Sequence, residues 1–205
     1  MNKKVVIIGA GGHGRVVSDI AESCGDTVLG FLDDGEVTNP NIKKLGKTSD
    51  AINYCDNDTY LFVAIGNCAV RRKIMENLPN ANWYTAIHPS AVISPSVKIG
   101  EGSCVMPNAV INNSAIIGKG VIINTCASVD HDSIIGDYTH IACGAHLAGT
   151  VTVGDTCWIG IGAIISNNIS ICNELTIGAG AVIVNDITEK GTYVGVPAKK
   201  LKKRA

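Results

Sequence analysis

The chain has 205 residues, of which 46% are hydrophobic and 17% are charged, and its formal net charge at neutral pH is −1. This length suits one large domain or two small ones. The nearly balanced charge excludes the broad basic footprint that nucleic-acid binding requires, so we expect no nucleic-acid partner. Aromatic residues make up only 4% and there are 23 glycines, which favours a repetitive β structure with a narrow interior.

The cysteines and the apolar segments bear on the cellular compartment. There are eight cysteines and no C-x-x-C pair. No signal peptide precedes Val5, and no apolar run approaches the roughly 18 residues that span a membrane. We therefore expect reduced thiols, a cytoplasmic location and no membrane insertion. The basic cluster in residues 199–204 is expected to be a solvated end, although its charge also suits an anionic ligand near the last repeat.

Residues 1–86 alternate between strand-like and helix-like patterns. Buried strands are expected at residues 4–8, 28–32 and 60–65, and helices at residues 15–24 and 69–78. In the first helix, Val16, Val17, Ile20 and Ala21 are expected to face inward. This β-α-β order predicts a small, mostly parallel sheet.

A glycine-rich loop joins the first strand to the first helix. Its sequence, Gly-Ala-Gly-Gly-His-Gly at residues 9–14, fits G-x-G-x-x-G and predicts a phosphate held at the helix N-terminus. Asp33 and Asp34 close the next strand, about 20 residues on, where an acid meets a ribose hydroxyl. No second nucleotide-binding half follows, so one nucleotide, as in a nucleotide-sugar, is favoured over a dinucleotide oxidoreductase. Alternatively, the glycines only tighten a β-α turn.

A different period begins at Ile87, where an aliphatic residue recurs at every sixth position. The series is Ile87, Ile93, Ile99, Val105, Ile111, Ile117, Ile123, Val129, Ile135, Ile141, Leu147, Val153, Ile159, Ile165, Ile171, Ile177 and Ile183. Helices and ordinary strands have other periods, so a fixed six-residue repeat predicts a solenoid. Three hexads are expected to form one triangular coil of a parallel β-helix.

The neighbours of each repeating aliphatic residue fit such a coil. A small residue such as Ala109 or Ala127 often stands two positions before it and is expected to face the interior. Glycine or asparagine often follows it, as at Gly118, and is expected to relieve the backbone at the corner. A cysteine nucleophile is conceivable in this region, but the cysteines, Cys157 among them, are better interpreted as small buried filler.

Three histidines of the repeat region are candidates for chemistry. His131 lies between Asp130 and Asp132, and flanking carboxylates fix the tautomer of an imidazole and raise its basicity, as in a general base. The alternative is an outward-facing polar corner residue, which is the favoured interpretation of His146. Gly149 follows His131 by one coil, so its N–H would lie above the histidine and polarise a thioester carbonyl. His140 lies half a coil from each.

Several motifs spread over both halves point to one family. They are V-I-I-G-A-G-G-H-G, F-L-D-D, A-I-G-N with R-R-K-I, I-H-P-S-A, I-N-T-C-A-S-V-D-H-D and V-G-V-P-A-K. In this order they resemble the bacterial sugar acetyltransferases of the NeuD/PglD type, which include sialic acid O-acetyltransferases and UDP-4-amino-sugar N-acetyltransferases. The resemblance implies a Rossmann-like nucleotide-sugar-binding domain at residues 1–86 and a left-handed β-helix with a C-terminal tail at residues 87–205. It also implies acetyl-CoA as cosubstrate, no metal, and a homotrimer with active sites between neighbouring prisms.

The resemblance also assigns roles to residues of the repeat region. His131 matches the general base, Asp132 the acid that orients it, and Asn124 a residue near the acceptor group. The matches along CoA are His140 and Gly149 at the acetyl end, Ile161 on the pantetheine arm, and Asn167, which stands where a related enzyme has proline. Asp132 is shorter than the glutamate of relatives.

In the N-terminal half the resemblance outlines the nucleotide-sugar pocket. Its members are Gly11, Gly12, His13, Asp33, Asp34, Gly66 and Arg72. His13 is additionally expected to reach toward the transferred group.

The expected function is N-acetylation, from acetyl-CoA, of the amino group of a nucleotide-linked sugar of the UDP-4-amino-4,6-dideoxy type, for bacterial glycan biosynthesis. One alternative is O-acetylation of sialic acid or CMP-sialic acid. A second is a zinc hydratase of the carbonic-anhydrase type, in which His131, His140 and His146 would supply metal ligands between subunits. A third is a non-catalytic trimeric scaffold.

Overall fold

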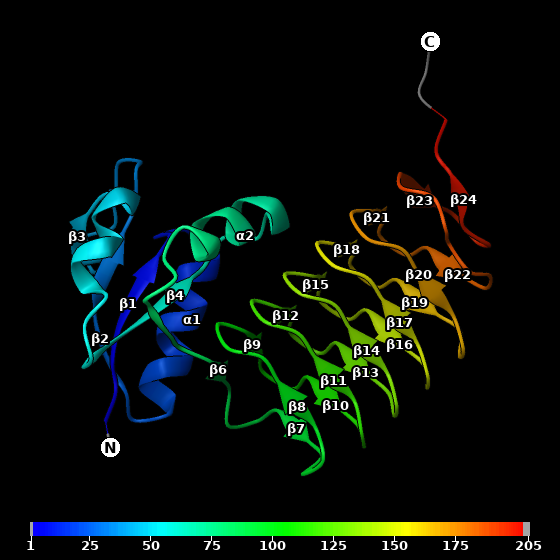
Figure 1. The fold of residues 1–205 in the computed structure, drawn as a ribbon, viewed down its shortest axis with the longest axis horizontal. Helices are drawn as coiled ribbons and strands as arrows, with labels where there is room; N and C mark the ends of the chain where they lie inside the picture. Colours follow the sequence, from blue (N-terminus) through cyan, green and yellow to red (C-terminus); the bar gives the residue numbers. More distant parts are fainter. Residues whose placement is uncertain (1, 203–205) are drawn as a thin grey trace.

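The computed structural model describes residues 2–202 and contains a small α/β part followed by a β-solenoid (Figure 1). The α/β part has a five-stranded parallel sheet in the order β3-β2-β1-β4-β5. Its strands are β1 (Lys4–Ile8), β2 (Thr27–Leu32), β3 (Lys44–Gly46), β4 (Thr59–Val63) and β5 (Asn82–Trp83). Its helices are α1 (Gly12–Ser23), the 3-10 helix η1 (Thr48–Tyr54) and α2 (Cys68–Glu76). The predicted parallel sheet is confirmed.

Helix α1 differs from the prediction in its start and in one inward residue. It begins at Gly12, inside the glycine loop, after an extended Gly11. Gly14 in its first turn packs against the start of the same loop, where a Cβ would lie 2.0 Å from the Gly9 carbonyl oxygen. Val17, Ile20 and Ala21 are buried as expected, but Val16 is 37% exposed, so its inward assignment was wrong. Strand β3 and helix η1 were not predicted, because their short segments carry no clear period.

The solenoid is a three-sided prism made of two-residue strands. These are β6 (Ala86–Ile87), β7 (Val92–Ile93), β8 (Lys98–Ile99), β9 (Cys104–Val105), β10 (Val110–Ile111), β11 (Ile116–Ile117), β12 (Ile122–Ile123), β13 (Ser128–Val129), β14 (Ile134–Ile135), β15 (His140–Ile141), β16 (His146–Leu147), β17 (Thr152–Val153), β18 (Trp158–Ile159), β19 (Ile164–Ile165), β20 (Ser170–Ile171), β21 (Thr176–Ile177) and β22 (Val182–Ile183). Every third strand joins the same parallel sheet. We name these sheet I (from β6), sheet II (from β7) and sheet III (from β8).

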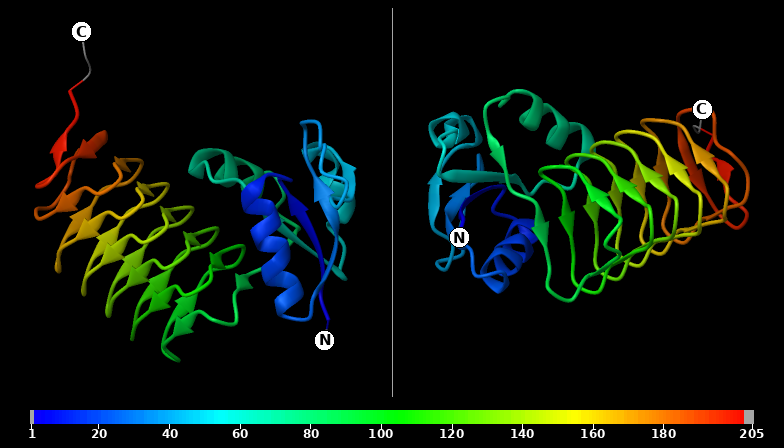
Figure 2. Two further views of the ribbon diagram at one scale, coloured as in Figure 1. Left: turned by 180° about the vertical axis from the view of Figure 1, so that it is seen from behind. Right: turned by 60° about the horizontal axis from the view of Figure 1, so that its bottom comes forward.

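The chain passes from sheet I to sheet II to sheet III in each coil, and the coils stack on one another (Figures 1 and 2). Residues eighteen positions apart are partners in the ladders, as with Ile122, His140 and Trp158 on sheet I. From Val105 to Ile183 all of the repeating aliphatic residues are buried along the axis. At the first coil Ile93 and Ile99 are partly buried against this core, and Ile87 is 36% exposed, so the interior begins later than the sequence pattern predicts. The period of six therefore defines both the interior and the register of the prism.

The structure corrects the role expected for the glycines that follow the aliphatic residues. Positive φ falls two positions further on, at residues such as Asn108, Asp132 and Gly120. A glycine at the earlier position is needed for close stacking instead: a Cβ on Gly100 would lie 2.5 Å from the carbonyl carbon of Gly118 in the next coil. The interpretation of the cysteines holds for Cys157, which is buried, and was wrong for Cys126, which is exposed with φ +57°.

The α/β part lies at the first coils of the prism (Figure 2) and shares core with them. Phe62 and Val17 belong to one buried cluster with Cys104 and Ile122 of sheet I. Tyr84 donates a hydrogen bond of 2.7 Å to Asp26 across the connection to the first coil. The two parts are therefore joined by packing over sheet I as well as by the chain.

The last coil is closed by β23 (Thr192–Val194), which is parallel to β21, and by β24 (Lys199–Lys200), which is antiparallel to β23. Lys200 pairs with Glu189 at 2.9 Å, so this end of the basic cluster is structured. Lys203 and Arg204 of that cluster lie outside the described residues. Within residues 2–202, no helix has the length and apolar character needed to cross a membrane.

Replacing Ile159 with alanine tests the coil interior. Ile159 is fully buried between Ile141 and Ile177, so Ile159→Ala should lower the free energy of unfolding by about 2–5 kcal/mol through lost burial and a cavity. Urea denaturation measures this change. Ser170→Ala, at an exposed outward position of sheet III, should change it by less than about 0.5 kcal/mol. Equal effects of the two substitutions would contradict the assignment of inward and outward positions.

Candidate functional site

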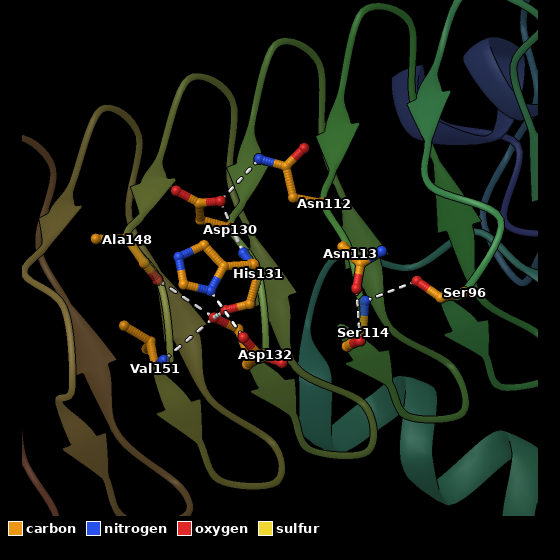
Figure 3. Close-up of polar contacts among 10 residues, drawn as sticks. Ser96, Asn112, Asn113, Ser114, Asp130, His131, Asp132, Ala148 and Val151 are labelled. Carbon is orange, nitrogen blue, oxygen red and sulfur yellow. Dashed lines mark hydrogen bonds and ion pairs between the residues drawn. The ribbon is translucent and has the colours of Figure 1, made fainter.

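His131 lies in the turn between β13 and β14, on the edge where sheet II meets sheet III (Figure 3). Its Nδ1 is 2.8 Å from Oδ2 of Asp132, and 57% of its side chain is exposed. This hydrogen bond is the main cause of a raised pKa for His131, and the negative charges of Asp130 and Asp132 add to it. Asp132 makes the contact from a backbone with φ +57°, which aspartate tolerates better than most residues.

Asp130 supports His131 in a different way from the one expected. Its Oδ1 accepts the His131 backbone N–H at 2.7 Å and an Nδ2 hydrogen of Asn112 at 2.8 Å. The hydrogen bonds from Asn112 and from the His131 backbone lower the pKa of Asp130, which stays ionised. Of the two flanking carboxylates, only Asp132 binds the imidazole, while Asp130 fixes the backbone beneath it.

Gly149 lies directly above His131 in the next coil, as the eighteen-residue spacing predicts. Thr150 N–H donates to the His131 carbonyl at 2.8 Å, and a Cβ on Gly149 would lie 2.6 Å from the imidazole Nε2. Only glycine leaves room for the ring. In residues 2–202 no hydrogen bond uses the Gly149 N–H. Asn167 continues the same column, since Asn168 N–H donates to the Gly149 carbonyl.

Asn124 and His140 form a second polar group, on and beside the outer face of sheet I. Nδ2 of Asn124 is 3.0 Å from Nε2 of His140, and Nδ1 of His140 is 3.4 Å from the Gly66 carbonyl oxygen. Oδ1 of Asn124 accepts the Thr125 N–H, so its amide nitrogen faces the histidine. This arrangement assigns the His140 proton to Nδ1 and makes Nε2 an acceptor. The ring packs against Trp158 at 4.4 Å between centroids.

Burial is the main reason why the pKa of His140 falls to about 3, and the positive charge of Arg71 lowers it further. His140 is therefore a neutral hydrogen-bonding group at ordinary pH, in contrast to His131. His140 is therefore suited to hydrogen bonding with a fixed orientation, and it is not suited to accepting a proton as a base.

The two polar groups do not meet within one chain. His131, Asp132, Gly149 and Asn167 lie on the edge between sheets II and III, opposite the face of sheet I that carries His140. Asn124 and Ile161 lie on the edge between sheets I and II. His140 was expected half a coil from His131 and Gly149, but half a turn of a triangular prism places a residue on the far side. The predicted CoA contacts are thus divided between two edges and a face.

The glycine loop lines a cavity of about 380 Å³. The cavity contains six of the seven residues predicted for the nucleotide-sugar pocket: Gly11, Gly12, His13, Asp33, Asp34 and Gly66. Oδ2 of Asp33 accepts the Ala10 N–H at 2.7 Å, and this bond, followed by one from Gly35, lowers the pKa of Asp33. Asp33 therefore braces the glycine loop and remains charged at the cavity wall.

His13 lies in the first turn of α1 and faces this cavity. Its Nε2 is buried and has no hydrogen-bond partner among the described residues. Burial, and secondly the charge of Arg71, lower the pKa of His13 to about 4. His13 is therefore neutral at the cavity wall, and one of its ring nitrogens is left without a hydrogen bond among these residues, which is costly for a buried polar atom.

Arg72, the seventh predicted residue, lies in a neighbouring cavity of about 760 Å³ between α2 and sheet I. It pairs with Glu76 at 2.8 Å and is partly exposed. Gly66 lines both cavities, and Trp158 lies on the wall of the larger one. Arg72 therefore lies in the cavity next to the glycine-loop cavity and does not line the glycine-loop cavity itself, so its assignment to the nucleotide-sugar pocket stays a prediction.

Sequence reasoning missed the arginine next to it. Arg71 is fully buried and donates hydrogen bonds only to backbone carbonyls. The signal was its spacing, because Cys68, Arg71 and Met75 recur along one face of α2 and all three are buried. A charged residue at an apolar helical position indicates a buried polar contact.

Comparisons with known proteins give the chain its relatives. Residues 4–78 match the family described as the PglD N-terminal domain. A curated relative, UDP-N-acetylbacillosamine N-acetyltransferase of Bacillus subtilis, is 36% identical over 111 residues. That match covers 51% of this chain and 51% of the relative, so the chain spans about half the length of the curated relative that it matches.

Two solved structures match almost end to end. The acetyltransferase domain of PglB from Neisseria gonorrhoeae is 40% identical, with a TM-score of 0.93, over 98% of this chain and 100% of that chain. The chain belongs to the PglD-type sugar acetyltransferase family. PerB from Caulobacter crescentus, solved with CoA and GDP-perosamine, is 38% identical, with a TM-score of 0.92, over 97% of each chain. The PglD-type fold therefore accounts for both parts of the molecule.

Replacing Asp132 with asparagine tests the histidine–aspartate pair. Because the Asp132 carboxylate is the main cause of the raised pKa of His131, Asp132→Asn should lower that pKa toward its ordinary value of about 6.5. NMR titration of labelled histidine measures the change. Asp130→Asn should lower the pKa less, because Asp130 does not bind the ring. An unchanged His131 pKa in Asp132→Asn would contradict the pairing.

Proposed function

We propose that this protein transfers the acetyl group of acetyl-CoA to the amino group of a nucleotide-linked amino sugar. One observation carries the proposal: His131 is oriented by Asp132, has a raised pKa, and keeps Nε2 beneath the Gly149 backbone. The glycine-loop cavity supplies a place for the nucleotide at the N-terminus of α1. The relatives support the same chemistry, since PerB was solved with CoA and a nucleotide-linked amino sugar.

The chemical step uses His131 as a general base. Nε2 accepts a proton from the sugar amine while the amine nitrogen forms a bond to the thioester carbonyl carbon. The Gly149 N–H, unused in residues 2–202, donates to the developing oxyanion. The C–S bond then breaks, the protonated His131 returns its proton to the sulfur, and CoA leaves as the thiol. Asp132 holds the ring and stabilises its protonated form, and no acyl-enzyme forms.

The site is completed between copies of the chain in this proposal. His131 faces solvent on an edge remote from the nucleotide cavity of its own chain, so a second copy must bring His131 to that cavity. Ile116 and Ile134 are 42% and 44% exposed on the outer face of sheet III, beside the His131 edge, and their burial would favour such packing. The proposed assembly is a homotrimer with three equivalent sites.

Further parts of the proposal rest on family resemblance. They are the left-handed coiling of the prism, the Rossmann-like character and boundary of residues 1–86, and a cytoplasmic location. In the same way Asn124 is assigned beside the acceptor amine, His140 and Gly149 at the acetyl group, Ile161 and Asn167 along CoA, and Arg72 near the sugar. Their division between edges and faces fits a site shared by two copies.

The alternative functions differ from the proposed one in the acceptor that is acetylated or in the need for a metal ion. Neutral His13 and charged Asp33 beside the glycine loop favour a nucleotide-linked acceptor over free sialic acid. A zinc hydratase would need ligands drawn from several copies, because no three His, Cys, Asp or Glu side chains in residues 2–202 are grouped as metal ligands within one chain. Incubation of the enzyme and acetyl-CoA with UDP- and GDP-linked 4-amino sugars, and separately with CMP-sialic acid, distinguishes the two acetylation reactions by product mass.

Replacing His131 with alanine tests the general base. His131→Ala should lower kcat by about 10²–10⁴-fold, while CoA binding, measured by calorimetry, stays within a few-fold of wild type. His146→Ala is the matched control, because His146 is exposed on the same prism and bonds only to Ser128. Near-normal turnover by a folded His131→Ala enzyme would refute the assignment.

A further inference from the structure

Arg71 is a buried cation without a carboxylate partner among the described residues. None of its surface is exposed, and the ion pairs within residues 2–202 do not include it. Its guanidinium instead bonds to carbonyl oxygens: Nε to Gly120 at 2.7 Å, Nη1 to Ile65 at 2.8 Å and Gly66 at 3.1 Å, and Nη2 to Tyr138 at 2.5 Å. A buried charge is costly unless it is fully hydrogen-bonded, so these carbonyls are held in place around it.

These carbonyls belong to the two parts of the molecule. Ile65 and Gly66 follow β4 in the α/β part, whereas Gly120 and Tyr138 lie in consecutive coils of the prism. The planar fork of arginine donates in several fixed directions at once, which a lysine ammonium cannot reproduce. Arg71 therefore fixes the position of the Ile65–Gly66 backbone relative to sheet I.

Gly66 connects the Arg71 hydrogen bonds to the candidate site. It lines both the glycine-loop cavity and the larger cavity between α2 and sheet I. Its carbonyl oxygen accepts from Arg71 and also lies 3.4 Å from Nδ1 of His140. A shift of this one peptide would change the glycine-loop cavity and the orientation of His140 together.

Two positively charged or titratable side chains lower the pKa of His140. Burial is the largest cause, Arg71 on α2 comes next, the hydrogen bond to Gly66 opposes them, and His13 on α1 adds a smaller lowering. The remaining neighbours, Asn124 and Trp158, are uncharged. Arg71 thus disfavours protonation of His140 while its bond to Gly66 keeps the acceptor of Nδ1–H in place.

We propose that Arg71 is a positioning residue that fixes the Gly66 peptide and, through it, one tautomer and orientation of His140, so that the nucleotide-sugar cavity and the acetyl-binding residues keep one alignment. The relevance of this alignment to turnover rests on the proposed acetyl transfer. Arg71 itself contacts neither cavity and takes no part in bond making. Its contribution is to the relative placement of two substrates, on which the rate of a bimolecular step depends steeply.

The first experiment uses the unmodified protein and does not depend on activity. Nitrogen chemical shifts of labelled His140 report its tautomer, and we expect a single neutral Nδ1–H form from about pH 8 down to pH 5. A dominant Nε2–H form, a tautomer mixture or titration within this range would overturn the proposal. Failure of the protein to acetylate any nucleotide-linked amino sugar would refute the proposed function and leave this measurement standing.

The second experiment compares Arg71→Lys with Lys73→Gln, a control at an exposed position of the same helix. Arg71→Lys keeps the charge but loses the fork. It should lower kcat by about 10²-fold, change KM for either substrate by no more than a few-fold, and give mixed His140 tautomers. Lys73→Gln should match wild type in all three. A folded Arg71→Lys protein with wild-type kcat and a wild-type His140 spectrum would overturn the proposal; if the variant does not fold, the tautomer of the unmodified protein decides.

Discussion

The fixed spacing of eighteen residues between stacked positions is the constraint from which the rest of the prism follows. Each strand pairs in parallel with the strands one coil before and one coil after it, as Ser128 does with His146. The buried aliphatic residue in every hexad keeps this spacing, because a shift by one residue would turn that row outward. The same spacing places Gly149 against the imidazole of His131, where no larger residue fits. The eighteen-residue spacing thus leaves room for the imidazole of His131 beside Gly149.

The geometry of the prism also explains why the polar residues fall into two groups with opposite electrostatics. His131 stands on an exposed edge beside two carboxylates, which raises its pKa. His140 lies beneath the α/β part near Arg71, which together with burial lowers its pKa to about 3. One imidazole is suited to accept a proton and the other to remain a neutral hydrogen-bonding group. The three-sided cross-section separates them, and the proposed function therefore assembles the site from two copies of the chain.

The sequence predicts the repeat well because its signal is redundant. Aliphatic residues from Val105 to Ile183 all face the interior, and the glycine loop follows a parallel strand as its pattern indicates. The stacking of Gly149 on His131 could also be counted from residue numbers. From the residue pattern alone, both carboxylates beside His131 were expected to bind its ring, and only the structure distinguishes them. Asp132 binds the ring because a left-handed backbone at this residue allows its short side chain to reach the imidazole.

Contacts between the two parts were beyond the reach of sequence patterns. Arg71 and Arg72 are adjacent and chemically alike, yet one is fully buried among carbonyls and the other pairs with Glu76 on the surface. Only the docking of α2 onto sheet I distinguishes them. The same docking brings Gly66 to His140 across 74 positions of sequence. Contacts between residues so far apart leave no repeating pattern in the sequence, so only the folded structure reveals them.

In the proposed assembly the nucleotide cavity of one copy works with His131 of another, and co-assembly of two inactive variants tests this most directly. His131→Ala removes the base, and Gly11→Trp should fill the cavity without disturbing the fold, because a Cβ at Gly11 meets nothing within 4 Å. Each variant alone should be inactive. Co-refolded in equal amounts, they should regain activity in about one quarter of the sites, where a wild-type cavity faces a wild-type His131. A mixture as inactive as its components would contradict the shared site.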